Sequence, residues 1–163
     1  MRTLEPVLGH RATGNRESAR DSYRRVESIH HALLRGKVIH PSALVDFRSI
    51  HYELSRKAFG EIIEKCPLSL EDWGTVLGID DFPKVVNKIT RFPTLHTEKI
   101  FETLLLCNLG KKVYGNEEDF KRWLNQQPIP YFGDRSPREL LGYSSGFNEL
   151  RKALQMIDYG QTA

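Results

Sequence analysis

Residues 94–115 read TLHTEKIFETLLLCNLGKKVYG and predict the longest helix of this chain. Thr94 or His96 is the expected first residue, and Gly115 is the glycine that ends the helix. Apolar side chains recur at helical spacing along one face, which is typical of a helix that packs against a core. These side chains are Ile100, Leu104, Leu105, Leu109 and Val113.

Shorter helices are predicted on the N-terminal side of this stretch. Ser69 is a suitable N-cap for a helix over residues 70–77, and Gly78 ends it. Glu71 and Asp72 lie in its first turn, where negative charge suits the helix dipole. Three further helices follow from apolar residues spaced three or four apart and from prolines and glycines at the ends. They span residues 21–36, about 54–66, and Pro83 to about Arg91.

The segment after residue 115 predicts two helices that flank a loop. Asn116 caps a helix that runs through Leu124, and residues 126–135 form a structured loop because they contain two prolines and a glycine. Ser136 opens a capping-box turn, and the final helix spans roughly residues 146–159. Little or no sheet is expected, since no segment alternates convincingly between apolar and polar residues. The predicted fold class is therefore all-α, a helical bundle.

Charge is unevenly distributed along the 163 residues, of which 39% are hydrophobic and 28% are charged. The net charge is +3, and residues 1–50 contain nine Lys/Arg against five Asp/Glu. Residues 1–20 contain little that can pack, so we expect a flexible basic arm there. Such an arm either lies along nucleic acid or is a solvated leader.

The sequence lacks the motifs of common enzymes, metal sites and membrane proteins. Cys66 and Cys107 lie among apolar residues, which indicates reduced thiols in a cytoplasmic protein. The histidines have no ligand or triad spacing, and no glycine-rich phosphate loop precedes a helix. We therefore expect no catalytic activity, no metal and no cofactor. Neither a signal peptide nor an apolar run of membrane-spanning length occurs, so no membrane contact is expected.

The two helices around Gly78 follow the order of a helix-turn-helix, whose second helix enters the major groove of DNA. Lys84, Lys88 and Arg91 fall at i, i+4 and i+7, with Asn87 beside them. The three cations can contact phosphates, while Asn87 or Arg91 reaches base edges. The alternative is a solvated helix face, which is the more common role of such a spacing.

The segment from Trp123 to Gly160 also has two interpretations. It is either a small helical hairpin that completes the core or a surface that binds a partner. Aromatic residues and prolines on a rigid loop are frequent interface anchors, which favours the second interpretation.

Two series of motifs carry a family resemblance. The first comprises LSRKAF at 54–59, PLSLEDW at 67–73, LGI at 77–79, TEKI at 97–100, VYG at 113–115 and FKRWL at 120–124. The second comprises Phe132-Gly133, Ser136-Pro137, Leu140-Leu141, Gly146, Leu150, Leu154 and IDYG at 157–160. From about Phe47 onward, the chain resembles the Xre/MbcA/ParS-type antitoxins, in particular the Xre antitoxins encoded beside RES-domain toxins.

After the flexible basic arm that composition predicts over residues 1–20, the resemblance implies a helix-turn-helix domain over 21–115 and a toxin-binding domain over 116–163. The helix-turn-helix domain would form a homodimer that binds operator DNA and represses the operon. The toxin-binding domain would cover the active site of a RES-type toxin that consumes NAD. The residues expected to bind the toxin are Trp123, Phe132, Gly133, Pro137, Leu141, Asp158, Tyr159 and Gly160. The alternative is a DNA-binding transcriptional regulator whose C-terminal helices only dimerise.

One region departs from the family pattern. Members carry a recognition helix of the form S-x-R-T-L-x-R, but the expected arginine positions fall on Phe82 and Val86 in this chain. Asp80 and Asp81 would also face DNA phosphates unfavourably. The departure bears on DNA binding and leaves the toxin-binding interpretation unchanged.

Overall fold

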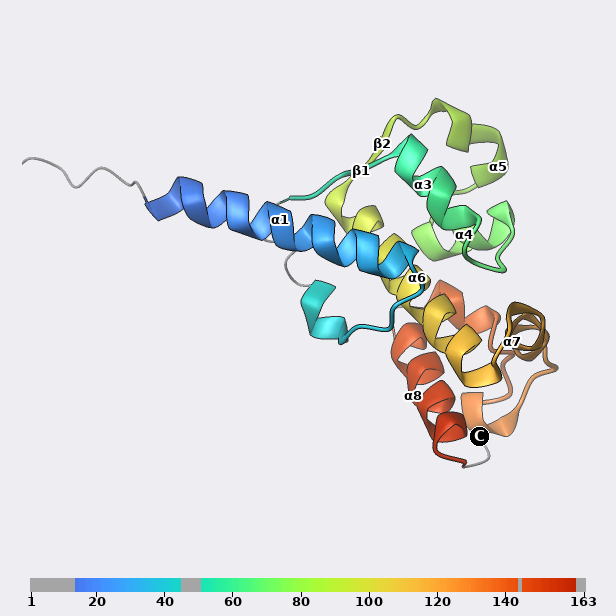
Figure 1. Ribbon diagram of the computed structural model, residues 1–163. Coiled ribbons are helices and arrows are strands. Elements are labelled where there is room, and N and C mark those ends of the chain that lie inside the picture. The colour runs from blue at the N-terminus through green and yellow to red at the C-terminus, as the bar shows by residue number, and fades with distance from the viewer. Residues whose placement is uncertain (1–13, 45–50, 144, 161–163) are drawn as a thin grey trace, which may run out of the picture.

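The computed structural model describes residues 14–44, 51–143 and 145–160, and it is almost entirely helical (Figure 1). The all-α fold class is confirmed. None of the helices in those ranges is long and apolar enough to cross a membrane. In chain order the elements are α1 Gly14–Leu34, η1 Pro41–Leu44, β1 Leu54–Ser55, α3 Arg56–Ile63, α4 Leu70–Leu77, α5 Phe82–Val85, η2 Val86–Lys88, β2 Arg91–Phe92, α6 Thr94–Tyr114, α7 Glu117–Leu124, η3 Pro130–Phe132, η4 Glu139–Gly142 and α8 Gly146–Asp158.

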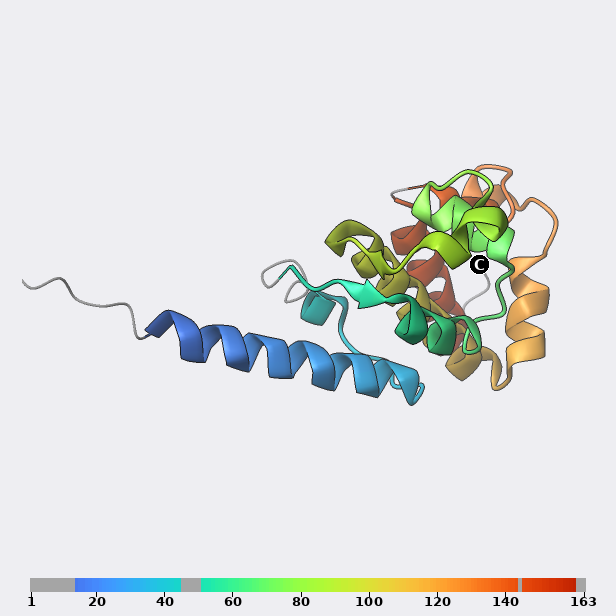
Figure 2. The ribbon, with the colours of Figure 1, turned by 90° about the horizontal axis from the view of Figure 1, so that it is seen from above.

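Helix α6 is the centre of the fold, and α1, η1, α4, α7 and α8 all pack against it (Figures 1 and 2). Its middle section is buried on nearly every side, from Thr97 to Gly110. A helix that is apolar all round can lie only at the centre of a domain, where neighbours cover each face. The sequence predicted its bounds correctly, with Gly115 in the left-handed conformation after the last turn.

Two buried polar side chains of α6 hold distant segments against it. The Asn108 amide donates hydrogen bonds to the carbonyl oxygens of Leu33 at 2.9 Å and Lys37 at 3.1 Å, at the end of α1. The Thr97 hydroxyl accepts from the Leu54 N–H at 3.0 Å and donates to the Phe92 carbonyl oxygen at 2.9 Å. Thr97 thereby joins β1 and β2 to α6. Because buried polar groups need partners, these bonds fix where each segment docks.

The predicted helix caps of α4 and α7 are confirmed. Ser69 and Asp72 form a reciprocal capping box, and Gly78 is left-handed at the end of α4. At the start of α7, the Asn116 side chain accepts a hydrogen bond from the Asp119 N–H at 2.8 Å. Each cap satisfies backbone donors that a helix end leaves unpaired.

Besides the packing of α7 and α8 on α6, two close contacts attach the C-terminal segment to the central helices. A Cβ at Gly110 would lie 2.1 Å from a ring carbon of Phe120, so only glycine lets α7 approach α6 this closely. On the other side, the guanidinium of Arg138 pairs with the Asp72 carboxylate at the start of α4. The turn before η4 has the predicted capping box, since the Ser136 N–H donates to Glu139 at 2.6 Å. This hydrogen bond and the Ser136 hydroxyl lower the pKa of Glu139.

Two expected boundaries require correction. Helix α1 begins at Gly14 rather than at residue 21, so the expected flexible arm over residues 1–20 is helical from residue 14 onward. Residues 1–13 lie outside the described part of the chain. The helix expected from Leu54 begins only at Arg56, because Leu54 and Ser55 pair as β1 with β2 and Ser55 is the N-cap. The domain boundary at residue 115 stays a prediction, and α6 contacts helices on both sides of it.

Candidate functional site

The predicted DNA-reading helix from Pro83 to Arg91 is not continuous. Helix α5 has four residues and is followed by the three-residue 3-10 turn η2, after which Ile89 is extended with ψ 122°. Arg91 lies in β2, so it does not share a helix face with Lys84 and Lys88. The prediction of one cationic helical stripe is therefore wrong.

Tertiary contacts of Arg56 and β1 explain why this helix ends early. The Arg56 guanidinium donates to the Val86 carbonyl oxygen at 3.2 Å, and the Arg56 backbone N–H donates to the Thr90 carbonyl oxygen at 3.0 Å. Beyond that point, Arg91 pairs with Ser55 and Phe92 with Leu54. These partners replace the helical hydrogen bonds that residues 90–92 would otherwise make.

All four predicted DNA-binding side chains are exposed, but two have partners within the protein. Lys84 pairs with Asp81 at 3.1 Å, and the Asn87 side-chain oxygen accepts a hydrogen bond from Arg56 at 3.0 Å. Asn87 is thus oriented by Arg56, and a base contact would have to compete with that bond. Lys88 and Arg91 lie at the ends of separate elements.

The predicted toxin-binding residues divide into a buried and an exposed group. Trp123, Phe132, Pro137 and Leu141 are buried. Trp123 lies among other rings, with centroid separations of 6.0 Å to Phe120, 6.1 Å to Tyr114 and 6.3 Å to Phe132. A side chain buried in this way supports the shape of a surface and is not itself available to a partner.

Exposed residues gather at the end of α8 and on the loop that leads through η3. Tyr159 is 82% exposed, Asp158 and Gly133 are exposed, and Gly160 is left-handed with φ 75°. Asp158 forms an ion pair with Lys112 of α6 at 3.8 Å. That pair links the last turn of α8 to the last turn of α6. Glycine at position 160 lets the backbone turn away from the helix without steric strain.

Sequence reasoning missed two members of this surface, Tyr131 and Met156. The Tyr131 hydroxyl lies 3.3 Å from the Met156 sulfur and donates a hydrogen bond to it, joining η3 to α8. The Tyr131 ring is 44% exposed and packs edge-on against Phe132 at 5.0 Å. We call the group Tyr131, Gly133, Met156, Asp158, Tyr159 and Gly160, which is exposed except for the half-buried Met156, the C-terminal surface. The sequence signal that could have identified Tyr131 was its place as a large aromatic residue between Pro130 and Phe132.

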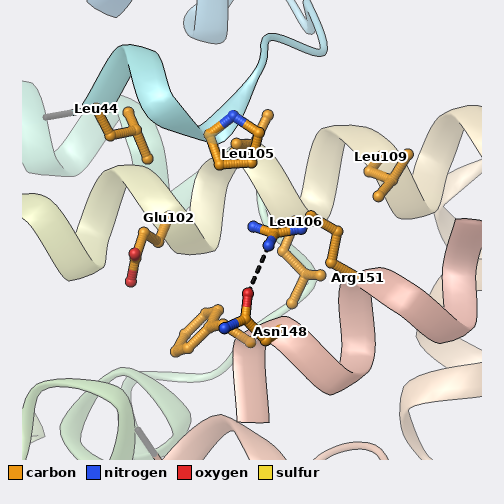
Figure 3. Close-up of a pocket in the computed structure, with 9 residues that line it drawn as sticks. Leu44, Glu102, Leu105, Leu106, Leu109, Asn148 and Arg151 are labelled. Atoms are coloured by element: carbon orange, nitrogen blue, oxygen red, sulfur yellow. Dashed lines mark hydrogen bonds between the residues drawn. The ribbon is translucent and has the colours of Figure 1, made fainter. Parts of the chain in front are cut away.

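The hollows of the described residues near this region are small or open. Figure 3 shows one between η1, α6 and α8, with Leu105, Leu106 and Leu109 of α6 facing Asn148 and Arg151 of α8. Its volume is about 60 Å³, whereas small-molecule sites have roughly 300–1,000 Å³. Arg151 donates a hydrogen bond to the Asn148 side-chain oxygen at 2.5 Å across its edge.

A more open hollow lies beside Trp123 and is lined by Tyr114, Asp119, Arg122 and Gln126. Burial raises the pKa of Tyr114 to about 12, so its hydroxyl stays protonated at neutral pH. This hollow is open to solvent, so it suits contact with a protein chain better than enclosure of a small molecule.

Comparison with known proteins assigns this part of the chain. Residues 109–160 match the family model of the antitoxin Xre/MbcA/ParS C-terminal toxin-binding domain. Comparison with curated proteins gave no match. The matched region begins within α6, includes α7, η3, η4 and α8, and ends at Gly160 on the C-terminal surface. Residues 109–160 therefore have the sequence pattern of the C-terminal toxin-binding domain of Xre/MbcA/ParS antitoxins, which supports an antitoxin role.

Proposed function

We propose that this protein neutralises a RES-domain, NAD-consuming toxin by placing its C-terminal surface over the toxin's active site. The observation that carries the proposal is the 82% exposure of Tyr159 within the matched toxin-binding domain. An exposed tyrosine offers a large apolar ring with a polar tip, which is the kind of anchor that dominates protein interfaces. Inhibition of this kind is stoichiometric and requires no catalytic residue in the antitoxin.

The helix that ends beneath Tyr159 is packed into the core, which favours tight binding. Helix α8 buries Leu150, Ala153 and Leu154 in the shared core, and Tyr131 holds Met156 from the neighbouring loop. A surface that is already ordered loses little conformational entropy when a partner binds. The buried residues Trp123, Phe132, Pro137 and Leu141 then have a positioning role, because they hold η3 and η4 against α7 and α8.

Charge at this surface is also suited to an NAD-consuming partner. A site that holds the phosphates of NAD presents cations to them, and a carboxylate can occupy such a position. Asp158 is exposed, and its Lys112 partner is 3.8 Å away in solvent, so this ion pair is weak and can be exchanged. Asp158 would therefore contact the toxin's cationic groups beside the Tyr159 anchor.

The decisive experiment measures inhibition of NAD consumption by the toxin encoded beside this protein. Tyr159→Ala should lose roughly 2 kcal/mol of toxin affinity, about thirtyfold, because it removes an interface anchor. Truncation after Asp158 should lose at least as much. Neither change should alter thermal stability by more than about 0.5 kcal/mol, since Tyr159 packs little against the protein.

The matched control is Leu95→Ala. Leu95 is 71% exposed, in the first turn of α6, whereas the C-terminal surface adjoins the last turn of that helix. This variant should inhibit the toxin as well as the wild type does. If truncation after Asp158 leaves inhibition unchanged, the C-terminal surface does not reach the active site. Failure of the full chain to bind any RES-domain toxin would refute the choice of partner.

A further inference from the structure

The positive charge of this protein is concentrated at its N-terminal end. Residues 1–25 contain six arginines, no lysine and three acidic residues, whereas the remaining residues contain 18 basic and 18 acidic side chains. The net charge of +3 therefore belongs entirely to this end, and the rest of the molecule is neutral overall. Arginine is the cation that pairs best with phosphate, because its planar guanidinium donates two parallel hydrogen bonds.

Helix α1 presents part of this charge on one exposed face. Arg20 and Arg24 are one helical turn apart, and together with Tyr23 and Glu27 they line a shallow hollow. Both arginines are exposed, and Tyr23 is 49% exposed beside Tyr52 at a ring separation of 5.7 Å. The N-terminal half of α1 extends beyond the other helices in both views (Figures 1 and 2). We call Arg20, Tyr23 and Arg24 the arginine face.

The composition and width of α1 indicate which class of polyanion it can bind. Residues 14–22 read GNRESARDS and contain no large apolar side chain that could insert into a lipid bilayer. A single helix with its side chains is about 10–12 Å wide, which matches the major groove of B-form DNA, and arginines on a helix at that groove reach the phosphates that border it. The deep and narrow major groove of A-form RNA does not offer this fit. Duplex DNA is therefore the best fit.

We propose that the arginine face of α1 binds the phosphate backbone of duplex DNA. This role is independent of the toxin-binding proposal, because it uses the opposite end of the chain. It also supplies DNA contacts in a protein whose predicted recognition helix is broken at Lys88. Binding through phosphates is insensitive to base sequence and depends strongly on salt.

The test measures binding of the full chain to a fluorescent mixed-sequence DNA duplex by anisotropy over a range of salt concentrations. Arg20→Gln/Arg24→Gln should weaken binding roughly tenfold at low salt and flatten the plot of log affinity against log salt by about two units. Arg20→Lys/Arg24→Lys should keep the wild-type salt slope, because the two charges remain. Glu27→Gln should tighten binding, since it removes a like charge to phosphate from the same hollow.

The control variant is Lys84→Gln/Lys88→Gln, which removes two exposed cations elsewhere and should leave the salt slope unchanged. Circular dichroism melting would establish that each variant is folded. Absence of wild-type binding to the duplex, or an unchanged slope in Arg20→Gln/Arg24→Gln, would overturn the proposal. So would a slope loss confined to the lysine variant, or tighter binding to an RNA duplex or to phosphatidylserine vesicles. Inhibition of the toxin should be normal in every variant.

Discussion

The C-terminal surface and the arginine face lie far apart in the molecule and are built in different ways (Figure 1). The C-terminal surface exposes the rings of Tyr131 and Tyr159 on elements that are anchored in the core. The arginine face exposes cations on a helix whose end extends past the core. Burial of an aromatic ring gives affinity that depends on shape, whereas charge on an exposed helix gives affinity that depends on salt.

The two surfaces should therefore respond differently to substitution. The C-terminal surface depends on the packing beneath it, so a core substitution there should affect both stability and toxin binding. The arginine face depends on the charge of its side chains, so its substitutions should affect neither.

Trp123→Ala should have the largest effect, because it removes a side chain that is only 4% exposed and lies among three other rings. Deletion of a buried aromatic side chain costs about 3–5 kcal/mol of unfolding free energy. Urea denaturation should show this loss, and toxin affinity should fall with it. A loss below about 1 kcal/mol would mean that the C-terminal surface does not depend on this cluster.

Arg138→Met should have the next largest effect. Arg138 joins η4 to the Asp72 carboxylate of α4, and the paired side chains are 30% and 13% exposed. Removing one member leaves a largely buried carboxylate with fewer partners, at a cost of about 1–3 kcal/mol. In a double-mutant cycle with Asp72→Asn, the two losses should not be additive. Additive losses would show that the two residues stabilise the protein independently.

Asn116→Ala should cost about 1 kcal/mol of unfolding free energy, since it removes the side chain that caps α7. The contacts of Tyr131 and Tyr159 are not altered by this change. Toxin affinity measured well below the melting temperature should therefore stay close to the wild-type value. A large drop in affinity at that temperature would indicate that α7 itself contacts the toxin.

Arg20→Glu/Arg24→Glu should have the smallest effect on toxin binding and stability, within about 0.5 kcal/mol for each. Its effect on DNA binding should instead be complete, because two attractive charges become repulsive. Calorimetry with the toxin and anisotropy with DNA provide the two measurements. Equal losses in both would contradict the separation of the two surfaces.

Local sequence signals predicted several elements well and failed where distant residues intervene. The bounds of α4, α6 and α7 followed from Ser69, Gly115 and Asn116, because a helix cap acts on backbone groups within a few residues. The expected helix from Pro83 to Arg91 had a local pattern just as clear. This helix does not continue to Arg91, because the guanidinium of Arg56, about 30 positions earlier, donates a hydrogen bond to the Val86 carbonyl oxygen and because β1 pairs with β2.

The candidate site shows the same limit. A motif identified the region and included Trp123, Phe132 and Tyr159, but it could not separate supporting residues from contact residues. Burial decides that difference, and burial depends on every helix that packs nearby. Tyr131 was missed for the same reason, since its place on the C-terminal surface depends on a contact with Met156, 25 positions away.

Local sequence signals specified the all-α class, the caps that set helix ends, the region that matches a toxin-binding domain and the excess of arginine near the N-terminus. Each of these depends on the residue itself or on neighbours within a turn or two of helix. Tertiary packing, in contrast, encloses α6 on nearly all sides, ends the helix before Arg91 through Arg56, and leaves Tyr159 exposed while it buries Trp123. These outcomes depend on contacts between residues far apart in the chain, which no local pattern specifies.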